Sequence, residues 1–164
     1  GLAGKAICLC GCPPANFGVC SGQDVVNAKA LAAGCGKHGV RCLSCGTDNH
    51  FMLGDPRPKA LNGKEAQETL DRAGIPVNKN AVPFDTSSPF KPGGIRVGTP
   101  AVTTRGMKEE EMLEIADLVA EALEKRSDSG ALEDVRKHVL DLTRRFSLPI
   151  LTHRRSSGRY SFAG

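Results

Sequence analysis

Apolar residues recur every three or four positions along four stretches of this chain, which is the spacing of an amphipathic helix with one buried face. Gly74 follows the second stretch and is predicted to end it as a C-terminal cap. The third stretch has the clearest pattern, because Met112, Ile115 and Val119 share one stripe and a run of glutamates lies at the positive end of the helix dipole. The pattern predicts four main helices, over residues 24–39, 62–74, 107–125 and 131–146.

Alternating polar and apolar residues predict strands between these helices. Strands are expected at 40–44, at 50–53 and at 95–98, with a short strand entry at 75–78. A long loop over residues 80–94 carries three prolines, two adjacent serines and a Gly-Gly pair, and loops of this length in a compact domain tend to be functional. The predicted fold class is α+β, with a small and mostly antiparallel sheet covered by helices.

The two ends of the chain differ from this central domain, which is expected over residues 23–149. Residues 1–22 are rich in Cys, Gly and Pro without a period, and an irregular segment is expected there. Residues 150–164 are expected to be a basic disordered tail. The stretch 144–159 holds five arginines and no acid, so its positive charge accounts for the whole net charge of +4.

Charge and hydropathy exclude several classes of partner. Without its basic tail the chain is close to neutral, which does not favour nucleic-acid binding. No apolar run is long enough for a membrane span, and the run at 6–10 is too short for the core of a signal peptide. A cytoplasmic protein without a membrane or nucleic-acid partner is the resulting expectation.

The seven cysteines are an odd number, which argues against a fully paired disulfide framework. Cys8, Cys10 and Cys12 could ligate a soft metal, but the spacing lacks a second Cys-x-x-Cys or a histidine pair that would complete a tetrahedral site. Cys42 and Cys45 are three apart in a predicted strand and would point to opposite faces. Reduced thiols and no metal site are therefore expected, with a thiol or metal module at the N-terminus as the alternative.

Arg96 is the most interesting single side chain of the sequence. Strand alternation sends Ile95 and Val97 to one face and Arg96 to the other. Glycines at 93, 94 and 98 suggest open space for a ligand around it, and a guanidinium can bind a carboxylate through two parallel hydrogen bonds. The alternative interpretation is a surface arginine on a half-solvated sheet.

The loop before Arg96 combines polar and aromatic side chains. Its amide and hydroxyl groups and its two flat rings suit a planar heterocycle with polar edges, but residue types alone favour a proline-braced surface loop. His50 is expected to be a histidine at the edge of the core. The loop residues concerned are Asn78, Asn80, Phe84, Ser87, Ser88 and Phe90.

Several motifs, in one order, resemble the C-terminal part of serine hydroxymethyltransferase. The resemblance covers about Val25 to Pro149, whereas the segment before Val25 shows none. The fold that it implies is that of the C-terminal domain of fold-type I pyridoxal-phosphate enzymes. The matching stretches are Val25–Leu31, Gly46-Thr-Asp-Asn-His50, Val77–Asp85, Ser88-Pro-Phe90, Gly93–Gly106 and Lys108–Leu118.

The resemblance implies an activity and roles for individual residues. The family uses pyridoxal phosphate to interconvert serine and glycine, and it passes the one-carbon unit to tetrahydrofolate to form 5,10-methylenetetrahydrofolate. Arg96 corresponds to the arginine that binds the carboxylate of the amino-acid substrate. Asn80, Ser88, Pro89 and Phe90 correspond to the loop that lines the folate site.

The resemblance also implies what this chain does not contain. The family's Schiff-base lysine lies in a Thr-rich stretch followed by Arg-Gly, within a large preceding domain, and no lysine of this chain has that context. Family members are homodimers whose sites draw on both subunits. The chain is therefore expected to hold no catalytic residue of its own and to be inactive without the large domain; the alternative is a stand-alone, non-catalytic module that binds folate or an amino acid.

Overall fold

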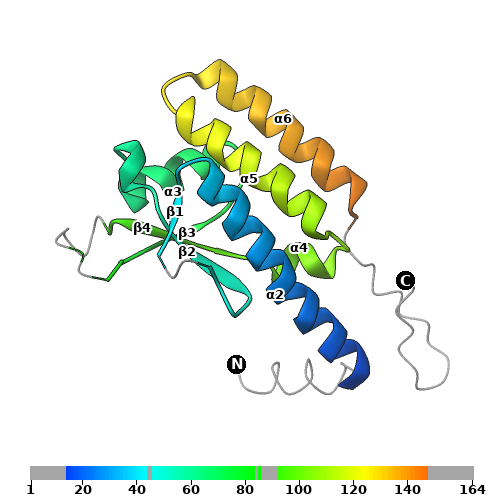
Figure 1. Ribbon diagram of the computed structural model, residues 1–164. Helices are drawn as coiled ribbons and strands as arrows, with labels where there is room; N and C mark the ends of the chain where they lie inside the picture. The colour runs from blue at the N-terminus through cyan, green and yellow to red at the C-terminus, as the bar shows by residue number, and fades with distance from the viewer. Residues whose placement is uncertain (1–13, 44–45, 84, 86–91, 148–164) are drawn as a thin grey trace, which may run out of the picture.

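The fold places helices on one side of a four-stranded antiparallel sheet (Figure 1). The computed structural model describes residues 14–43, 46–83, 85 and 92–147, with side chains from residue 18 onward. Met52 and Ile95 point from the sheet toward the helices and are 1% and 0% exposed. The predicted α+β class, with a small antiparallel sheet covered by helices, is confirmed.

The sheet has the order β1-β2-β4-β3. Its central pair is formed by β2 and β4, with Leu53 opposite Arg96. On the other side of β4, the edge strand β3 places Asn78 opposite Arg96. The strands are β1 (Arg41–Cys42), β2 (Phe51–Asp55), β3 (Asn78–Asn80) and β4 (Gly94–Gly98).

The boundaries of all four strands differ from the prediction, and the strand entry expected at 75–78 is found as β3, Asn78–Asn80. β2 continues through Gly54 to Asp55, beyond the predicted end at Leu53, because Gly54 pairs with Cys42 and Asp55 with Arg41 on β1. β1 itself has two residues in the described part of the chain. A short local sequence pattern cannot reveal such pairing, since the partner strand decides where a ladder ends.

The predicted helices are all present. Asn62 begins α3 with a capping box in which its side chain accepts from the Glu65 amide and the Glu65 carboxylate accepts from the Asn62 amide. Gly74 follows α3 at φ 81°, which confirms its predicted role as a cap. The helices are α2 (Pro14–Lys37), the 3-10 helix η1 (Arg57–Lys59), α3 (Gly63–Arg72), α4 (Pro100–Thr104), α5 (Glu109–Glu124) and α6 (Ser129–Arg145).

The start of α2 corrects the prediction for the N-terminal segment. The helix begins at Pro14, ten residues before the expected start, so the irregular structure predicted for 1–22 is wrong from Pro14 onward. Proline is compatible with the first position of a helix. Once the packed half of α2 has formed, extending the helix by further residues costs little, and this explains why a stretch without an amphipathic period is helical.

The core lies between the sheet and the pair α2 and α5. Leu31, Met112 and Leu123 are almost fully buried there, together with Met52 and Ile95 of the sheet. The two helices approach closely at Gly34, where a Cβ atom would come within 2.6 Å of the Ala116 Cβ. A residue larger than glycine at position 34 would push α2 away from α5.

Candidate functional site

The face of the sheet that points away from the helices carries the predicted substrate-binding residue. Residues that lie opposite each other in an antiparallel pair point to the same face, so the register places Leu53, Asn78 and Arg96 on one face. Phe51 and Asn80 are two positions along their strands and share that face. Arg96 is exposed, whereas Ile95 before it is fully buried on the opposite face.

The Arg96 guanidinium is held by an aromatic ring. Its central carbon lies 5.8 Å from the centroid of the Phe51 ring, within the range of a cation–π contact. The His50 ring packs against Phe51 edge to face, at 5.2 Å and 77°. His50 is exposed, so the expectation of a histidine at the edge of the core is corrected, because the β2 strand begins after it and leaves its ring at the rim of the open face.

No acidic residue in the described part of the chain forms a salt bridge with Arg96. No described residue accepts a hydrogen bond from its five N–H donors, and the cation–π contact restrains the side chain. A guanidinium in this state is suited to bind a carboxylate. The sequence signalled the exposure of Arg96 through alternation, but it gave no sign of Phe51, which becomes a neighbour through the pairing of β2 with β4.

The predicted folate-site residues fall partly within the described chain. Asn80 lies opposite Gly94 on the edge strand, on the same sheet face as Arg96, and its amide nitrogen donates to the Ala81 carbonyl at 2.8 Å. Ser88, Pro89 and Phe90 lie outside the described residues, as do Phe84 and Ser87. The structure therefore places Arg96 and Asn80 on one face.

Two of the three glycines around Arg96 have a different role from the predicted one. Gly93 and Gly94 are buried, and a Cβ atom at Gly94 would come within 2.4 Å of Val82. A Cβ atom at Gly93 would lie 3.1 Å from the Arg57 side chain. These glycines allow close packing inside the protein, so the expectation that they leave open space for a ligand is wrong at both positions. Gly98 is exposed and has only ordinary contacts.

Two sets of hydrogen bonds involve aspartates near the long loop. The Arg57 guanidinium donates to both oxygens of the Asp55 carboxylate at 2.8 Å, and the Arg57 amide donates to the same carboxylate at 3.1 Å. The hydrogen bonds from Arg57 hold the pKa of Asp55 below its ordinary value, against the effect of burial. Asp85 accepts a hydrogen bond from the Gly93 amide at 2.7 Å. This last bond ties Asp85 to the residue that precedes β4.

Other motif residues hold α2 against the segment after β4. Asn27 is fully buried and donates to the Thr103 hydroxyl and to the Met107 carbonyl, both at 2.9 Å. Its carbonyl oxygen accepts from the Gln23 amide nitrogen at 3.0 Å. Thr99 is also fully buried, and its hydroxyl donates to the Asp24 carbonyl at 2.8 Å. Asn27 and Thr99 thus connect two motifs far apart in the sequence.

Arg105, the second arginine of the Gly93–Gly106 motif, has a structural position. Its side chain donates to the carbonyl oxygens of Thr143 and Phe146 at 2.6–2.8 Å, at the C-terminal end of α6. A cation at this end of a helix satisfies free carbonyl groups and interacts favourably with the helix dipole. The structure therefore distinguishes the two arginines: Arg105 has partners within the chain, and Arg96 faces solvent.

The cysteines of the described chain differ in exposure. Cys20 is exposed and Cys35 is buried. Burial, with a smaller effect of the nearby Cys42, raises the pKa of Cys35 to about 12. No group of three or more potential metal ligands occurs among the described residues, and Cys8, Cys10, Cys12 and Cys45 lie outside them.

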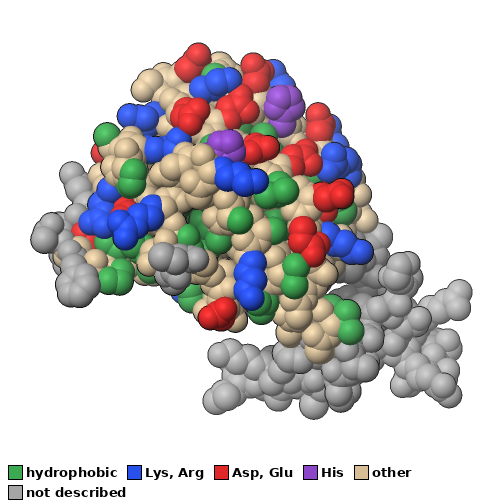
Figure 2. Space-filling view, viewed as in Figure 1, with side chains coloured by type: hydrophobic (Ala, Val, Ile, Leu, Met, Phe, Trp, Pro, Cys, Tyr) green, Lys and Arg blue, Asp and Glu red, His purple; other side chains and the backbone are tan. Residues whose placement is uncertain are grey.

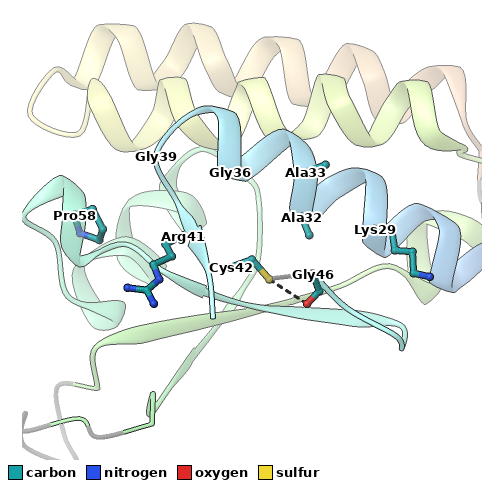
Figure 3. Close-up of a pocket in the computed structure, with 9 residues that line it drawn as sticks. All are labelled: Lys29, Ala32, Ala33, Gly36, Gly39, Arg41, Cys42, Gly46 and Pro58. Carbon is teal, nitrogen blue, oxygen red and sulfur yellow. Dashed lines mark hydrogen bonds between the residues drawn. The ribbon is translucent and has the colours of Figure 1, made fainter. Parts of the chain in front are cut away.

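A groove of about 610 Å³ lies between α2 and β1, away from Arg96 (Figure 3). Its walls come from the small residues of α2 on one side and from β1 on the other, where Ala32 points toward Cys42. Two basic residues, Lys29 and Arg41, complete it at its ends. The groove and the open face of the sheet are separate features of the surface.

A family model described as serine hydroxymethyltransferase matches residues 1–119. The chain belongs to the serine hydroxymethyltransferase family. It is 48% identical over 147 residues to the serine hydroxymethyltransferase of Myxococcus xanthus (strain DK1622) and 47% identical over 147 residues to that of Acidobacterium capsulatum. These alignments cover 90% of this chain and 35% and 34% of the two proteins.

A third relative, the serine hydroxymethyltransferase of Koribacter versatilis (strain Ellin345), is 44% identical over 156 residues, covering 95% of this chain and 36% of that protein. The chain thus spans about a third of the length of these serine hydroxymethyltransferases. The match from residue 1 corrects the expectation that the resemblance begins at Val25.

None of the helices in the described part of the chain combines the length and the apolar character that a membrane crossing requires.

The cofactor of the serine hydroxymethyltransferase family, pyridoxal phosphate, requires a lysine for its Schiff base. Lys79 is the only lysine in the described strands. It lies opposite the buried Ile95, on the other face from Arg96. Lys29 lines the groove, with an exposed side chain 3.9 Å from Asp48. Neither of these two lysines lies beside Arg96 on the open face of the sheet.

Proposed function

We propose that this chain forms the substrate-binding C-terminal portion of a serine hydroxymethyltransferase. In the complete enzyme, serine and tetrahydrofolate are converted to glycine and 5,10-methylenetetrahydrofolate in the cytoplasm, with pyridoxal phosphate as cofactor. The observation that carries the proposal is the exposed Arg96 guanidinium on the open side of the sheet, and membership of the family supports an amino-acid carboxylate as its ligand.

Arg96 binds the carboxylate of serine or glycine through two parallel hydrogen bonds. Because a bidentate pair fixes the plane of the carboxylate as well as its distance, it also fixes the direction of the bond from Cα to the side chain that must break. Phe51 restrains the guanidinium from one side without using its donors. Arg96 is thus a binding and orienting residue, and the chemistry takes place on groups outside this chain.

Asn80, together with Ser88, Pro89 and Phe90, lines the folate site. Asn80 supports this role by its position, since it lies on the same sheet face as Arg96 and therefore on the side from which a co-substrate reaches the amino acid. The hydrogen bond from the Gly93 amide to the Asp85 carboxylate connects two positions within the loop. Folate binding and carboxylate binding are accordingly two functions of one side of the sheet.

The Schiff-base lysine belongs to the portion of the enzyme that this chain does not span. Relatives are about three times as long as the matched region, and a large domain that carries the cofactor, within a homodimer, is the partner. The chain by itself then forms no internal aldimine with pyridoxal phosphate. An absorbance band of such an adduct in the isolated chain would contradict this assignment.

The test is a chimera in which this chain replaces the matching region of the Myxococcus xanthus enzyme. Arg96→Gln should raise the KM for serine about a hundredfold, because it removes a charge-assisted pair of hydrogen bonds to the substrate. Arg136, an exposed arginine on α6, supplies the matched control, and Arg136→Gln should leave KM unchanged. An unchanged KM in Arg96→Gln would refute the proposal.

Calorimetry separates the proposal from a stand-alone binding module. If the isolated chain bound glycine or tetrahydrofolate without a partner, the second interpretation would hold. The proposed function requires that neither ligand gives a measurable heat of binding with the isolated chain, since each site is completed by the large domain. Both ligands should bind to the chimera.

A further inference from the structure

A hollow of about 480 Å³ lies between helix α3 and the turn that joins α5 to α6. Its volume is in the range of sites that bind small molecules. Helix α3 packs on the side of the sheet that buries Ile95, whereas Arg96 points to the opposite face. The hollow and the proposed substrate-binding face are therefore on different sides of the sheet.

Two guanidinium groups line this hollow, from Arg72 at the end of α3 and from Arg126 in the turn. Arg72 Nη2 donates to the Ser129 hydroxyl oxygen at 3.1 Å, and Arg126 Nη1 donates to the Leu123 carbonyl at 3.3 Å. Both acceptors are neutral. In the described part of the chain no acidic side chain forms a salt bridge with either arginine, so the charge of the two groups is not neutralised there.

Other basic residues of this region have acidic partners. Figure 2 shows acidic and basic side chains side by side over α5 and α6. Lys125 lies 2.7 Å from the Glu121 carboxylate, and Lys137 lies 2.8 Å from that of Asp134. Arg72 and Arg126 depart from this pattern of surface ion pairs, and an anion in the hollow that they line would neutralise them.

The carboxylates near the hollow already have partners within the chain. Glu65 accepts from the backbone amide of Asn62 in the capping box of α3. Asp128 accepts from two backbone amides at the start of α6. Glu68 lies 3.6 Å from the Lys64 ammonium group, and both side chains are largely exposed. Two of the carboxylates thus cap helices, and Glu68 is the one that can meet a further cation.

The chemistry of the arginines favours a phosphoryl group over a carboxylate. One guanidinium can bind both oxygens of a carboxylate through two parallel hydrogen bonds, so a carboxylate needs only one of the two arginines. A phosphate monoester carries a charge of about −1.5 to −2 at neutral pH and has three strong acceptor oxygens. These can accept from both guanidinium groups and from the hydroxyl of Ser127, which also lines the hollow.

We propose that this hollow binds a small phosphate monoester that carries an amino group. Arg72 and Arg126 bind the phosphoryl oxygens, and the Ser127 hydroxyl donates to one of them. Glu68 lines the hollow four residues before Arg72, on the same side of α3, and its carboxylate accepts from the amino group. The buried Leu61 contributes apolar surface beside these groups. This site does not depend on the function proposed for Arg96.

The test is a titration of the full chain with inorganic phosphate, ethyl phosphate and phosphoethanolamine at constant ionic strength. Nuclear magnetic resonance follows the Nε–H signals of the arginines. Arg72 and Arg126 should shift in a saturable way with all three compounds, and Arg144 should not shift. Phosphoethanolamine should bind about threefold to fivefold more tightly than ethyl phosphate, because its amino group gains a partly exposed contact with Glu68.

Variants assign the binding to individual side chains. Arg72→Gln and Arg126→Gln should each weaken the binding of phosphoethanolamine about tenfold, because each removes charge-assisted hydrogen bonds. Arg144→Gln is the matched control, since Arg144 is an exposed arginine near the other end of α6, and it should leave the affinity unchanged. Glu68→Gln should make the two esters bind equally. Thermal melts of each variant check that the chain remains folded.

Two results would overturn the phosphate site. Shifts at Arg72 and Arg126 that rise linearly without saturation would show that no site exists, and so would an affinity that neither arginine variant changes. Equal affinities of the two esters in the wild type would overturn the assignment of the amino group. The titration involves neither serine nor folate, so its outcome and that of the Arg96 test are independent.

Discussion

Arg96 on β4 lies with its guanidinium carbon 5.8 Å from the centroid of the Phe51 ring on β2. The two residues are 45 positions apart and meet because β2 pairs with β4. The contact restrains a charged side chain that has no acidic partner among the described residues. It therefore restrains Arg96 without using any of its N–H donors.

Replacing the ring is expected to weaken substrate binding slightly. Phe51→Leu keeps an apolar side chain but removes the cation–π contact, which is worth about 0.5–1 kcal/mol at an exposed site. In the chimera, the KM for serine should rise about twofold to fivefold, and Phe51→Tyr, which keeps the ring, should behave as wild type. A larger KM in the tyrosine variant than in the leucine variant would show that the ring does not position Arg96.

Removing the Asn27 amide is expected to destabilise the fold. Asn27→Leu leaves the Met107 carbonyl buried without its donor and removes the link to Thr103, and an unsatisfied buried polar group costs about 1–3 kcal/mol. Urea unfolding of the isolated chain should report a loss of about this size. Asn78→Ala on the edge strand, where the side chain is exposed, serves as the control and should have little effect.

The Asp55–Arg57 pair makes stability depend on acidity. The hydrogen bonds from Arg57 lower the pKa of Asp55 in the folded chain. The contribution of this carboxylate to the free energy of unfolding is therefore fully present above the ordinary aspartate pKa, and it is lost as the pH falls through the lower pKa of the folded chain. Asp55→Asn should therefore lower the melting temperature at neutral pH. The difference between the two proteins should shrink as the pH is lowered below the ordinary aspartate pKa of about 4.

Thermal melts of the wild type and Asp55→Asn across this pH range check the sign of the effect. Asp134→Asn is the control, because Asp134 forms an exposed ion pair with Lys137 on α6. This variant should change the melting temperature only slightly. A difference between wild type and Asp55→Asn that grows as the pH falls would contradict the prediction.

Cys35 is expected to be unreactive in the folded protein. Burial and the neighbouring Cys42 raise its pKa to about 12, so almost no thiolate is present at neutral pH, and the thiolate is the reactive form. After treatment with iodoacetamide, mass spectrometry of peptides should show that the exposed Cys20 is modified in the folded chain. Cys35 should be modified only when urea is present. Equal modification of both cysteines without denaturant would show that the C-terminal part of α2 opens readily.

The predicted helices illustrate how much of the fold a local pattern can reveal. The stripe at Met112 and Val119 is buried in α5, and Gly74 caps α3 with a positive φ. The local pattern does not predict the start of α2, because the first half of this helix lacks a polar face. That half is helical as a continuation of the packed second half. The packing at Gly93 and Gly94 is not predictable from the sequence for a related reason, since composition alone cannot show whether the space beside a glycine is filled.

The sequence by itself determined the fold class, the helices and the outward direction of Arg96, because these depend on periods of three to four and of two residues along the chain. Membership of the family was also visible in its motifs. Only the tertiary structure decided that Phe51 neighbours Arg96, that Asn27 and Thr99 bind across to another motif, and that Arg72 and Arg126 line one hollow. These relationships depend on strand register and helix packing, which residues distant in sequence determine together.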